Sequence, residues 1–405
     1  MSSCRPSHVT VVGLGADGWA GLPEPARARV RSAAVLVGGR RHLDLVPEVD
    51  GQQREPWPSP LRAGLVELMA RHAGAPLVVL ASGDPFVSGI GTTLAEVFGA
   101  DVTEVLPAVS SVSLARARMR WSAESTQVVS LVGRDPHAVL RHLAPAHRLL
   151  VLSSDESTPG DVAALLVATG YGDTRMTVLG DLGSADESCV EGTAATWTAS
   201  SRPVSRLNVV ALDLRGPVVG SWATGLRDED FEHDGQLTKR DLRASALARL
   251  APQPGQLLWD VGAGAGSVSI EWMRAHPTCT AVAVEADPDR AARIGRNAAS
   301  LGVPTLRVVP GRAPEAFDEL PDPDAVFVGG GATRRGVVSG SLARLAPGGR
   351  LVVHGVTLET ETLLARLYAE HGGELTRIAV EHAAPIGGFT GWTPARTVTQ
   401  WAVTS

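Results

Sequence analysis

Short apolar runs that end in Gly, Asp or Pro recur along the first half of the chain, between about Val9 and Leu214. Four of them read HVTVVGLG, AAVLVGG, APLVVLASGDP and RLLVLSS. Continuous apolar runs bounded by turn residues are typical of strands that are buried on both faces, as in parallel sheets. Two more, TRMTVLGDLG and LNVVALDL, follow beyond Pro145. We therefore expect parallel strands alternating with helices, one of which opens at SSVSLARARMRW behind a serine cap.

The second half shows the same alternation more regularly. A helix DLRASALARLAP is followed by strand LLWDVG, helix SVSIEWMRAH, strand TAVAVEAD and helix PDRAARIGRNAASLG. The alternation continues through strands TLRVVPG, DAVFVGGG and RLVVHGV to helix LETETLLARLYAEHGG. Two final runs, ELTRIAVEHA and TVTQWAVTS, have no helix between them and predict an antiparallel pair at a sheet edge. The pattern favours an α/β protein with a doubly wound parallel sheet in this half.

The length of the chain points to more than one domain. Its 405 residues exceed what one ordinary hydrophobic core holds. The polar stretch RGPVVGSWATGLRDEDFEHDGQLTKR separates the two halves and lacks apolar periodicity. We expect a first domain over residues 1–215, a linker over 216–230 and a second domain over 231–405.

Composition and charge exclude several classes of protein. Charged residues make up 20% of the chain and the net charge is −6, whereas a general nucleic-acid binder is normally basic. Cys4, Cys189 and Cys279 are odd in number and far apart, which indicates neither a disulfide framework nor a metal site. Apolar runs are too short to span a membrane, and the N-terminus runs straight into a strand without a secretion signal. We therefore expect a cytoplasmic protein.

The stretch LLWDVGAGAGSVSIEW carries the clearest chemical signal. Glycine-rich backbone lies between a strand and a helix, and Glu285 ends the next strand, where an acid grips a ribose diol. Two cofactors fit, a dinucleotide or S-adenosylmethionine. Ser267 stands where the dinucleotide pattern G-x-G-x-x-G requires its third glycine, so we favour S-adenosylmethionine. The candidate loop comprises Gly262, Ala263, Gly264, Ala265 and Gly266.

The C-terminal half resembles the decarboxylating precorrin methyltransferases of cobalamin biosynthesis, from about Phe231 to Trp401. The matching segments are DGQLTKRDLRASALARL, LWDVGAGAGSVSIEW, GRAPEAF, VFVGGG, LAPGGRLVVHGVTLET and HGGELTRIAV. The resemblance implies a class I S-adenosylmethionine methyltransferase fold. It adds Thr238 and Ala313 to the glycine loop and Glu285 as residues around the cofactor. Arg312 stands where many related enzymes carry an acid.

The N-terminal half resembles the tetrapyrrole methylase family, through VVGLGADGW, VLVGGRRHLDL, ASGDPFVSGIG, PAVSSVSLARARMRW and LVGRDP. That resemblance implies an unrelated fold of two α/β lobes, with S-adenosylmethionine in the cleft between them. The cofactor-binding residues it implies are Gly13, Gly15, Gly83, Asp84 and Ser111. Without the resemblance, Gly83-Asp84-Pro85 reads as a plain turn.

Together the two resemblances imply a bifunctional enzyme with one S-adenosyl-L-methionine per domain. The N-terminal domain would methylate carbon 5 of a precorrin. The C-terminal domain would methylate carbon 15 and remove CO2 from the acetate at ring carbon 12, giving precorrin-8X. The alternatives are a methyltransferase of a cobalt-containing precorrin, RNA or protein, and a non-catalytic sensor of S-adenosylmethionine. We expect a tetrapyrrole substrate, no nucleic acid or membrane partner, and a homo-oligomer.

A tetrapyrrole carries many carboxylates, which arginine binds in two places at once. Four clusters could supply such cations, although a solvated helix face is the better explanation of any single one. They are Arg40, Arg41 and His42; Arg116, Arg118 and Arg120; Lys239, Arg240 and Arg243; and Arg334 with Arg335. His354 is interpreted as a structural histidine. The sequence assigns no catalytic residue and no metal ligand.

Overall fold

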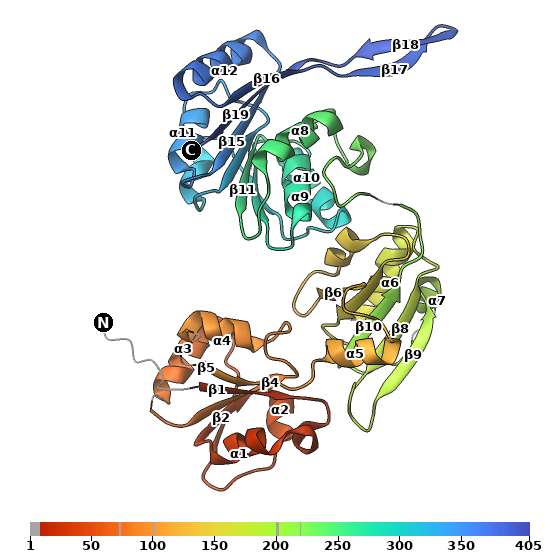
Figure 1. The fold of residues 1–405 in the computed structure, drawn as a ribbon, viewed down its shortest axis with the longest axis vertical. Coiled ribbons are helices and arrows are strands. Elements are labelled where there is room, and N and C mark those ends of the chain that lie inside the picture. The colour runs from red at the N-terminus through yellow and green to blue at the C-terminus, as the bar shows by residue number, and fades with distance from the viewer. Residues whose placement is uncertain (1–8, 73, 100, 102, 200–201, 219) are drawn as a thin grey trace. The chain divides into compact units, whose positions relative to one another are not determined.

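The computed structural model describes residues 9–72, 74–99, 101, 103–199, 202–218 and 220–405, so Cys4 lies outside the described residues (Figure 1). The chain divides into two units. Unit 1 comprises residues 1–136 and 144–217, and unit 2 comprises residues 137–143 and 218–405. Each unit has its own sheets and core and is described by itself. Among the described residues, every helix is too short or too polar to cross a bilayer.

The first lobe of unit 1 is built on a parallel sheet with the strand order β3-β2-β4-β1-β5. Its strands are β1 (Val9–Leu14), β2 (Val35–Gly38), β3 (Gln53–Pro56), β4 (Leu77–Ser82) and β5 (Thr103–Leu106). Two separate apolar clusters show that both faces are covered. The covering elements are η1 (Gly18–Gly21), α1 (Glu24–Ser32) and α2 (Arg40–Asp44) on one face, and α3 (Leu61–Arg71) and α4 (Ile90–Phe98) on the other.

The second lobe of unit 1 holds a mixed sheet with the order β6-β7-β10-β8-β9. Only β6 and β7 run parallel and every other pair is antiparallel. The expectation that the runs TRMTVLGDLG and LNVVALDL form parallel strands is therefore wrong. An apolar run that is buried on both faces looks the same in either direction, and the short connection between β8 and β9 permits only an antiparallel pair. The strands are β6 (Thr126–Ser130), β7 (Arg148–Leu152), β8 (Arg175–Gly180), β9 (Ser188–Thr193) and β10 (Asn208–Asp213).

The helices of this lobe are α5 (Ser111–Met119), α6 (Thr158–Ala168) and α7 (Ala194–Ala199); η3 (Pro136–His142) falls largely within unit 2. The Ser110 hydroxyl caps α5 by accepting from the Ser113 amide at 3.1 Å, which confirms the predicted serine cap.

Unit 2 contains a seven-stranded sheet with the order β13-β12-β11-β14-β15-β19-β16. It is parallel except for β19, which is antiparallel to both neighbours and confirms the predicted pair at the edge. The strands are β11 (Leu257–Val261), β12 (Thr280–Glu285), β13 (Arg307–Pro310), β14 (Ala325–Val328), β15 (Arg350–Gly355), β16 (Glu374–Ile378) and β19 (Val398–Thr404).

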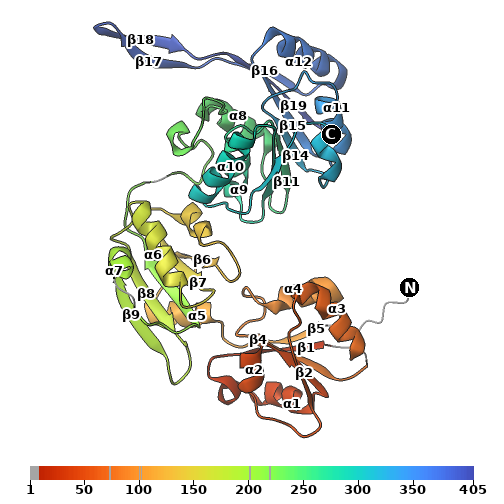
Figure 2. The same cartoon turned by 180° about the vertical axis from the view of Figure 1, so that it is seen from behind.

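Helices cover both faces of this sheet, as expected of a doubly wound fold (Figure 2). One face packs against α8 (Arg240–Leu250), α9 (Ser267–Ala275) and α10 (Pro288–Ser300). The other packs against η5 (Glu315–Glu319), α11 (Val337–Arg344) and α12 (Leu358–His371). A single 3-10 turn, η4 (Asp228–Asp230), precedes α8.

A two-stranded hairpin extends from the rest of unit 2 in both views. It consists of β17 (Glu381–Ile386) and β18 (Phe389–Pro394). The run ELTRIAVEHA is therefore not one strand, because β16 ends at Ile378 and the hairpin begins three residues later. The hairpin leaves large apolar side chains in solvent, with Phe389 85% and Trp392 70% exposed.

Candidate functional site

Unit 1 has a cavity of about 710 Å³ at the carboxyl ends of β1 and β4, lined by residues from both of its lobes. Gly15, Gly83, Asp84 and Ser111 line it, four of the five residues that the resemblance implied. Gly13 lies behind the wall, where a Cβ would sit 2.0 Å from the carbonyl oxygen of Gly83. Gly13 therefore permits the strand ends to approach, rather than facing the cavity.

The turn at Gly83 explains why these residues meet. Its N–H donates to the Leu14 carbonyl at 2.9 Å and its own carbonyl accepts from the Ala108 amide at 3.1 Å. Gly83 has φ +50°, a left-handed conformation that favours glycine. An Asp84 carboxylate oxygen accepts from the Phe86 amide at 2.9 Å, which is the ordinary geometry of an aspartate turn. The segment is thus both a tight turn and part of the cavity wall.

Two arginines, Arg41 and Arg206, line the same cavity from different lobes. His42 lies beside Arg41, with its Nε2 2.8 Å from the guanidinium and 2.9 Å from the Ser82 hydroxyl. Burial, and then the charge of Arg41, lowers the pKa of His42 to about 4. The imidazole is therefore neutral at pH 7, and the arginines are the permanent cations.

Sequence reasoning missed two charged residues of the cavity wall, Arg206 and Asp181. Each lies next to a strand end in the sequence, Asp181 directly after β8, and that position could have identified them. The cluster on α5 does not contribute to the wall in the described structure: Arg118 pairs with Glu187 at 2.5 Å instead. Arg40 likewise is not among the lining residues.

Unit 2 has a smaller cavity, of about 280 Å³, at the carboxyl ends of its parallel strands. Gly262, Glu285 and Ala313 line it, whereas Thr238 and the remaining loop residues lie outside the lining. Those loop residues shape the backbone: Gly264 has φ +59° and Gly266 has φ +75°. A Cβ on Gly266 would lie 2.7 Å from Ile294. Gly330 and Gly331 of VFVGGG complete one side.

Glu285 is only 6% exposed, and its carboxylate holds the loop. One oxygen accepts from the Gly264 amide at 2.8 Å and the other from the Asp287 amide at 3.0 Å. Each oxygen keeps a lone pair for a further donor, such as a ribose hydroxyl. The Glu285 carboxylate and the glycine backbone beside it therefore fit S-adenosylmethionine.

Asp260 holds the first turn of α9, the helix that follows the glycine loop. Its buried carboxylate accepts from the Ser269 amide at 3.0 Å, which places a negative charge at the N-terminus of α9. Burial raises the pKa of Asp260 to about 6. In the part of the chain that the structure describes, no cluster of His, Cys, Asp and Glu is arranged to hold a metal ion.

The cation clusters of unit 2 divide between the cavity and the core. Arg312 and Arg334 line the cavity, and Arg334 forms an ion pair with Glu315 at 2.8 Å. The expectation that Arg243 could receive a substrate is wrong, because its side chain is fully buried against Glu271. His354 is buried beside the Gln400 amide at 2.8 Å, and burial lowers its pKa to about 4. It is thus a neutral core residue, as predicted.

Comparison with known proteins finds a different family match in each half of the chain. Residues 8–197 match the family of tetrapyrrole (corrin/porphyrin) methylases, and residues 229–405 match the precorrin methyltransferase domain. The chain is 47% identical to the precorrin-6Y C(5,15)-methyltransferase [decarboxylating] of a Sinorhizobium species, over 100% of this chain and 99% of the relative. It is 46% identical to the protein of that name from Mycobacterium tuberculosis, over 98% and 99%.

Among solved structures, the C-terminal domain of precorrin-6Y C5,15-methyltransferase from Rhodobacter capsulatus is 45% identical, with a TM-score of 0.44. It covers 46% of this chain and 100% of that domain. The fold and the matches define a tetrapyrrole methylase joined to a precorrin methyltransferase domain, within an S-adenosylmethionine-dependent methyltransferase family. The chain belongs to the precorrin-6Y C5,15-methyltransferases (decarboxylating) of cobalamin biosynthesis.

Proposed function

We propose that each unit holds its own S-adenosylmethionine and serves one position of precorrin-6Y. Unit 1 methylates carbon 5; unit 2 methylates carbon 15 and releases CO2 from the acetate at ring carbon 12, giving precorrin-8X. The supporting observation is the presence of two separate glycine-bounded cavities, one in each unit, at the carboxyl ends of unrelated parallel sheets. Ligands of open α/β sheets bind at such strand ends.

The residues of the proposed cofactor sites divide by role. In unit 1, Gly15, Gly83, Asp84 and Ser111 form the wall and Gly13 allows the strands to close. In unit 2, Gly262, Glu285 and Ala313 form the wall. The other residues of the proposed site are Thr238, Ala263, Gly264, Ala265 and Gly266, of which Gly264 donates its amide to Glu285.

The chemistry needs alignment more than strong acids or bases. S-adenosylmethionine supplies an electrophilic methyl group, and the nucleophile is an electron-rich bridging carbon of the macrocycle. Holding the two reactants in line can contribute about 7–11 kcal/mol. The arginines at the cavities, Arg41 and Arg206 in unit 1 and Arg312 and Arg334 in unit 2, would bind substrate carboxylates. Electrons left by CO2 pass into the conjugated ring, so we assign no catalytic residue.

Two matched glycine variants test the division of labour. In Gly264→Ala, the new Cβ meets the Gln236 carbonyl oxygen at 2.7 Å, so the loop must shift. We expect a loss of about 10- to 100-fold in carbon-15 methylation and in CO2 release, with carbon-5 methylation retained. In Gly83→Ala, where φ is +50°, we expect the opposite pattern.

Two control variants carry the same backbone strain away from the cavities. Gly51 and Gly255 have φ +75° and +83°, and a Cβ at either position meets nothing within 4 Å. Gly51→Ala and Gly255→Ala should leave both methylations unchanged when labelled S-adenosylmethionine and precorrin-6Y are supplied. Loss of both methyl transfers in Gly264→Ala alone would contradict two independent sites. Methylation of a cobalt-containing precorrin, RNA or protein in preference to precorrin-6Y would favour the alternatives; binding without turnover would favour a sensor.

A homo-oligomer and a cytoplasmic location belong to the same proposal. The hairpin supports self-association, because Ile386 and Phe389 face each other on one side while Trp392 opposite Ala383 occupies the other. Each face thus carries an exposed aromatic side chain, and a second copy of the chain would cover both. Light scattering of Phe389→Ser/Trp392→Ser should show a smaller particle than the unaltered chain; equal masses would contradict this role.

A further inference from the structure

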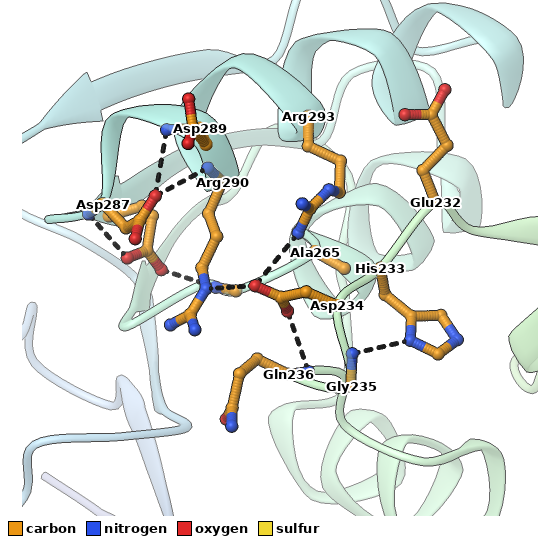
Figure 3. A network of polar contacts seen from close by, with 12 residues as sticks. Glu232, His233, Asp234, Gly235, Gln236, Ala265, Asp287, Asp289, Arg290 and Arg293 are labelled. Atoms are coloured by element: carbon orange, nitrogen blue, oxygen red, sulfur yellow. Dashed lines mark hydrogen bonds and ion pairs between the residues drawn. The ribbon is translucent and has the colours of Figure 1, made fainter.

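The glycine loop of unit 2 belongs to a ring of contacts, all but one of them polar; Figure 3 shows polar contacts of this ring. Its first half runs from the loop to α10. The Gly264 amide donates to Glu285, whose second oxygen accepts from the Asp287 amide. Asp287 in turn caps α10 by accepting from the Asp289 and Arg290 amides at 2.9 and 3.1 Å.

The second half of the ring returns through the segment that precedes α8. The Arg290 guanidinium donates to Asp234 at 2.8 Å, and Arg293 lies 3.3 Å from the same carboxylate. The other Asp234 oxygen accepts from the Gln236 amide at 3.1 Å. The Gln236 carbonyl closes the ring by packing rather than by a hydrogen bond, because its oxygen would lie 2.7 Å from a Cβ added to Gly264.

The ring fixes a segment, residues 232–238, against the glycine loop; we call this segment the strap. At its start, the Glu232 amide donates to the Asn297 side chain at 2.8 Å, and Asn297 also donates to the Ala265 carbonyl at 2.9 Å. Asn297 is only 1% exposed, so this end is anchored in the core. The far end carries Thr238. Between these ends, Asp234 is the side chain that ties the strap to α10.

The Asp234 side chain is an ionised carboxylate in the folded protein. Hydrogen bonding from Arg290, followed by that from the Gln236 amide, holds the pKa of its carboxyl well below the usual range. The ion pair therefore persists at every pH at which an enzyme of this kind would work. Both partners are about one-third exposed, so the pair contributes modestly to global stability.

We propose that Asp234 is a positioning residue for the cofactor of unit 2. Anchored to α10 by Arg290 and Arg293, it holds Gln236 against Gly264 and so keeps the Gly264 amide and the Glu285 carboxylate in the geometry that receives S-adenosylmethionine. This inference rests on the proposed function of the unit 2 cavity.

The test compares Asp234→Ala with Arg296→Ala in the full-length chain. Arg296 also leaves α10 toward the strap, but its pair with Glu232 at 2.9 Å is more than half exposed and lies outside the ring. For carbon-15 methylation of precorrin-6Y, we expect Asp234→Ala to raise the KM for S-adenosylmethionine about fivefold, with kcat at saturation unchanged. Arg296→Ala should change neither constant, and carbon-5 methylation should be unaffected in both.

Three further measurements separate positioning from a structural role. Arg290→Ala should raise KM similarly, and the Asp234→Ala/Arg290→Ala double variant should add little. Asp234→Asn keeps an acceptor for the Gln236 amide and should give a smaller rise. Melting temperatures of Asp234→Ala and Arg296→Ala should agree.

A KM for Asp234→Ala equal to that for Arg296→Ala, or fully additive effects in the double variant, would overturn the inference. A matched fall in melting temperature and kcat at unchanged KM would do so as well. Gly264→Ala, assayed in parallel, reports on the proposed function itself. If Gly264→Ala spares carbon-15 methylation, the site is wrong. If Gly264→Ala abolishes carbon-15 methylation while Asp234→Ala leaves the KM for S-adenosylmethionine unchanged, only the positioning role fails.

Discussion

The buried ion pair between Arg243 and Glu271 offers the sharpest test of how unit 2 is held together. Both side chains are almost completely removed from solvent, at 0% and 2% exposure, and their nearest atoms are 2.5 Å apart. Glu271 also accepts from the amides of Gly225 and Leu226, at 2.5 and 2.9 Å. Arg243 additionally donates to the carbonyls of Thr238 and Leu226. The pair therefore ties the chain entering unit 2 to α8 and α9.

We predict that Arg243→Met destabilises unit 2 by about 3–5 kcal/mol. Methionine fills much of the volume, but it leaves the Glu271 charge buried without a cation, which is the costly way to break such a pair. The two carbonyls also lose a donor, at about 1 kcal/mol each within that range. Adding Glu271→Leu should not restore stability, because the amides of Gly225 and Leu226 would then be unsatisfied.

Hydrogen exchange resolved by peptide is the appropriate assay, because two units need not unfold in one transition. In Arg243→Met, amides of β11 and β12 should exchange more than about 100-fold faster, while those of β1 and β4 keep their wild-type rates. The control is Arg296→Met, which breaks a pair that is more than half exposed and should cost at most about 1 kcal/mol. Equal, small effects of the two variants would refute the reasoning.

Three further predictions concern buried groups. Because the pKa of His354 is lowered to about 4, the unfolded chain binds a proton that the native state does not, so stability should fall as pH falls from about 6.5 to 4; His354→Gln should flatten the melting temperature of unit 2 over that window. The pKa of Asp260 is raised to about 6, so the stability gained by protonating its buried carboxyl is lost as pH rises from about 4 to 6. Asp260→Asn should remove this slope, which is opposite in sign to that of His354. Melting temperatures with the same pH dependence in Asp260→Asn and the unaltered chain would contradict the shift. Gly13→Ala places a Cβ 2.0 Å from the Gly83 carbonyl oxygen and should destabilise unit 1 by about 1–3 kcal/mol and abolish carbon-5 methylation, while product analysis still finds a methyl at carbon 15.

Local pattern was sufficient for most elements and for the glycine turns. Apolar periodicity predicted the strand that contains Asp260 and the strand β12 that ends in an acid. The glycines after Asp260 follow from backbone conformations that glycine adopts readily. The same reasoning placed Gly262 at a cavity wall, since strand ends of a parallel sheet share one edge. Gly83 was assigned to a cofactor site only through the family resemblance, because the residues alone read as a plain turn. Local pattern did not predict the strand directions in the second lobe of unit 1, because an apolar run buried on both faces is compatible with parallel and antiparallel pairing.

The sequence by itself therefore determined the two α/β halves, their glycine loops and the acid beside one of them, because short-range periodicity and backbone conformation are local properties. Tertiary structure alone decided which charges face a cavity and which lie in the core. Arg243 looked like a surface cation until packing against Glu271 buried it, whereas Arg206 reached the same cavity as Arg41 only through the approach of two lobes. A long charged side chain takes its role from the elements packed around it, and that packing involves residues far apart in the chain.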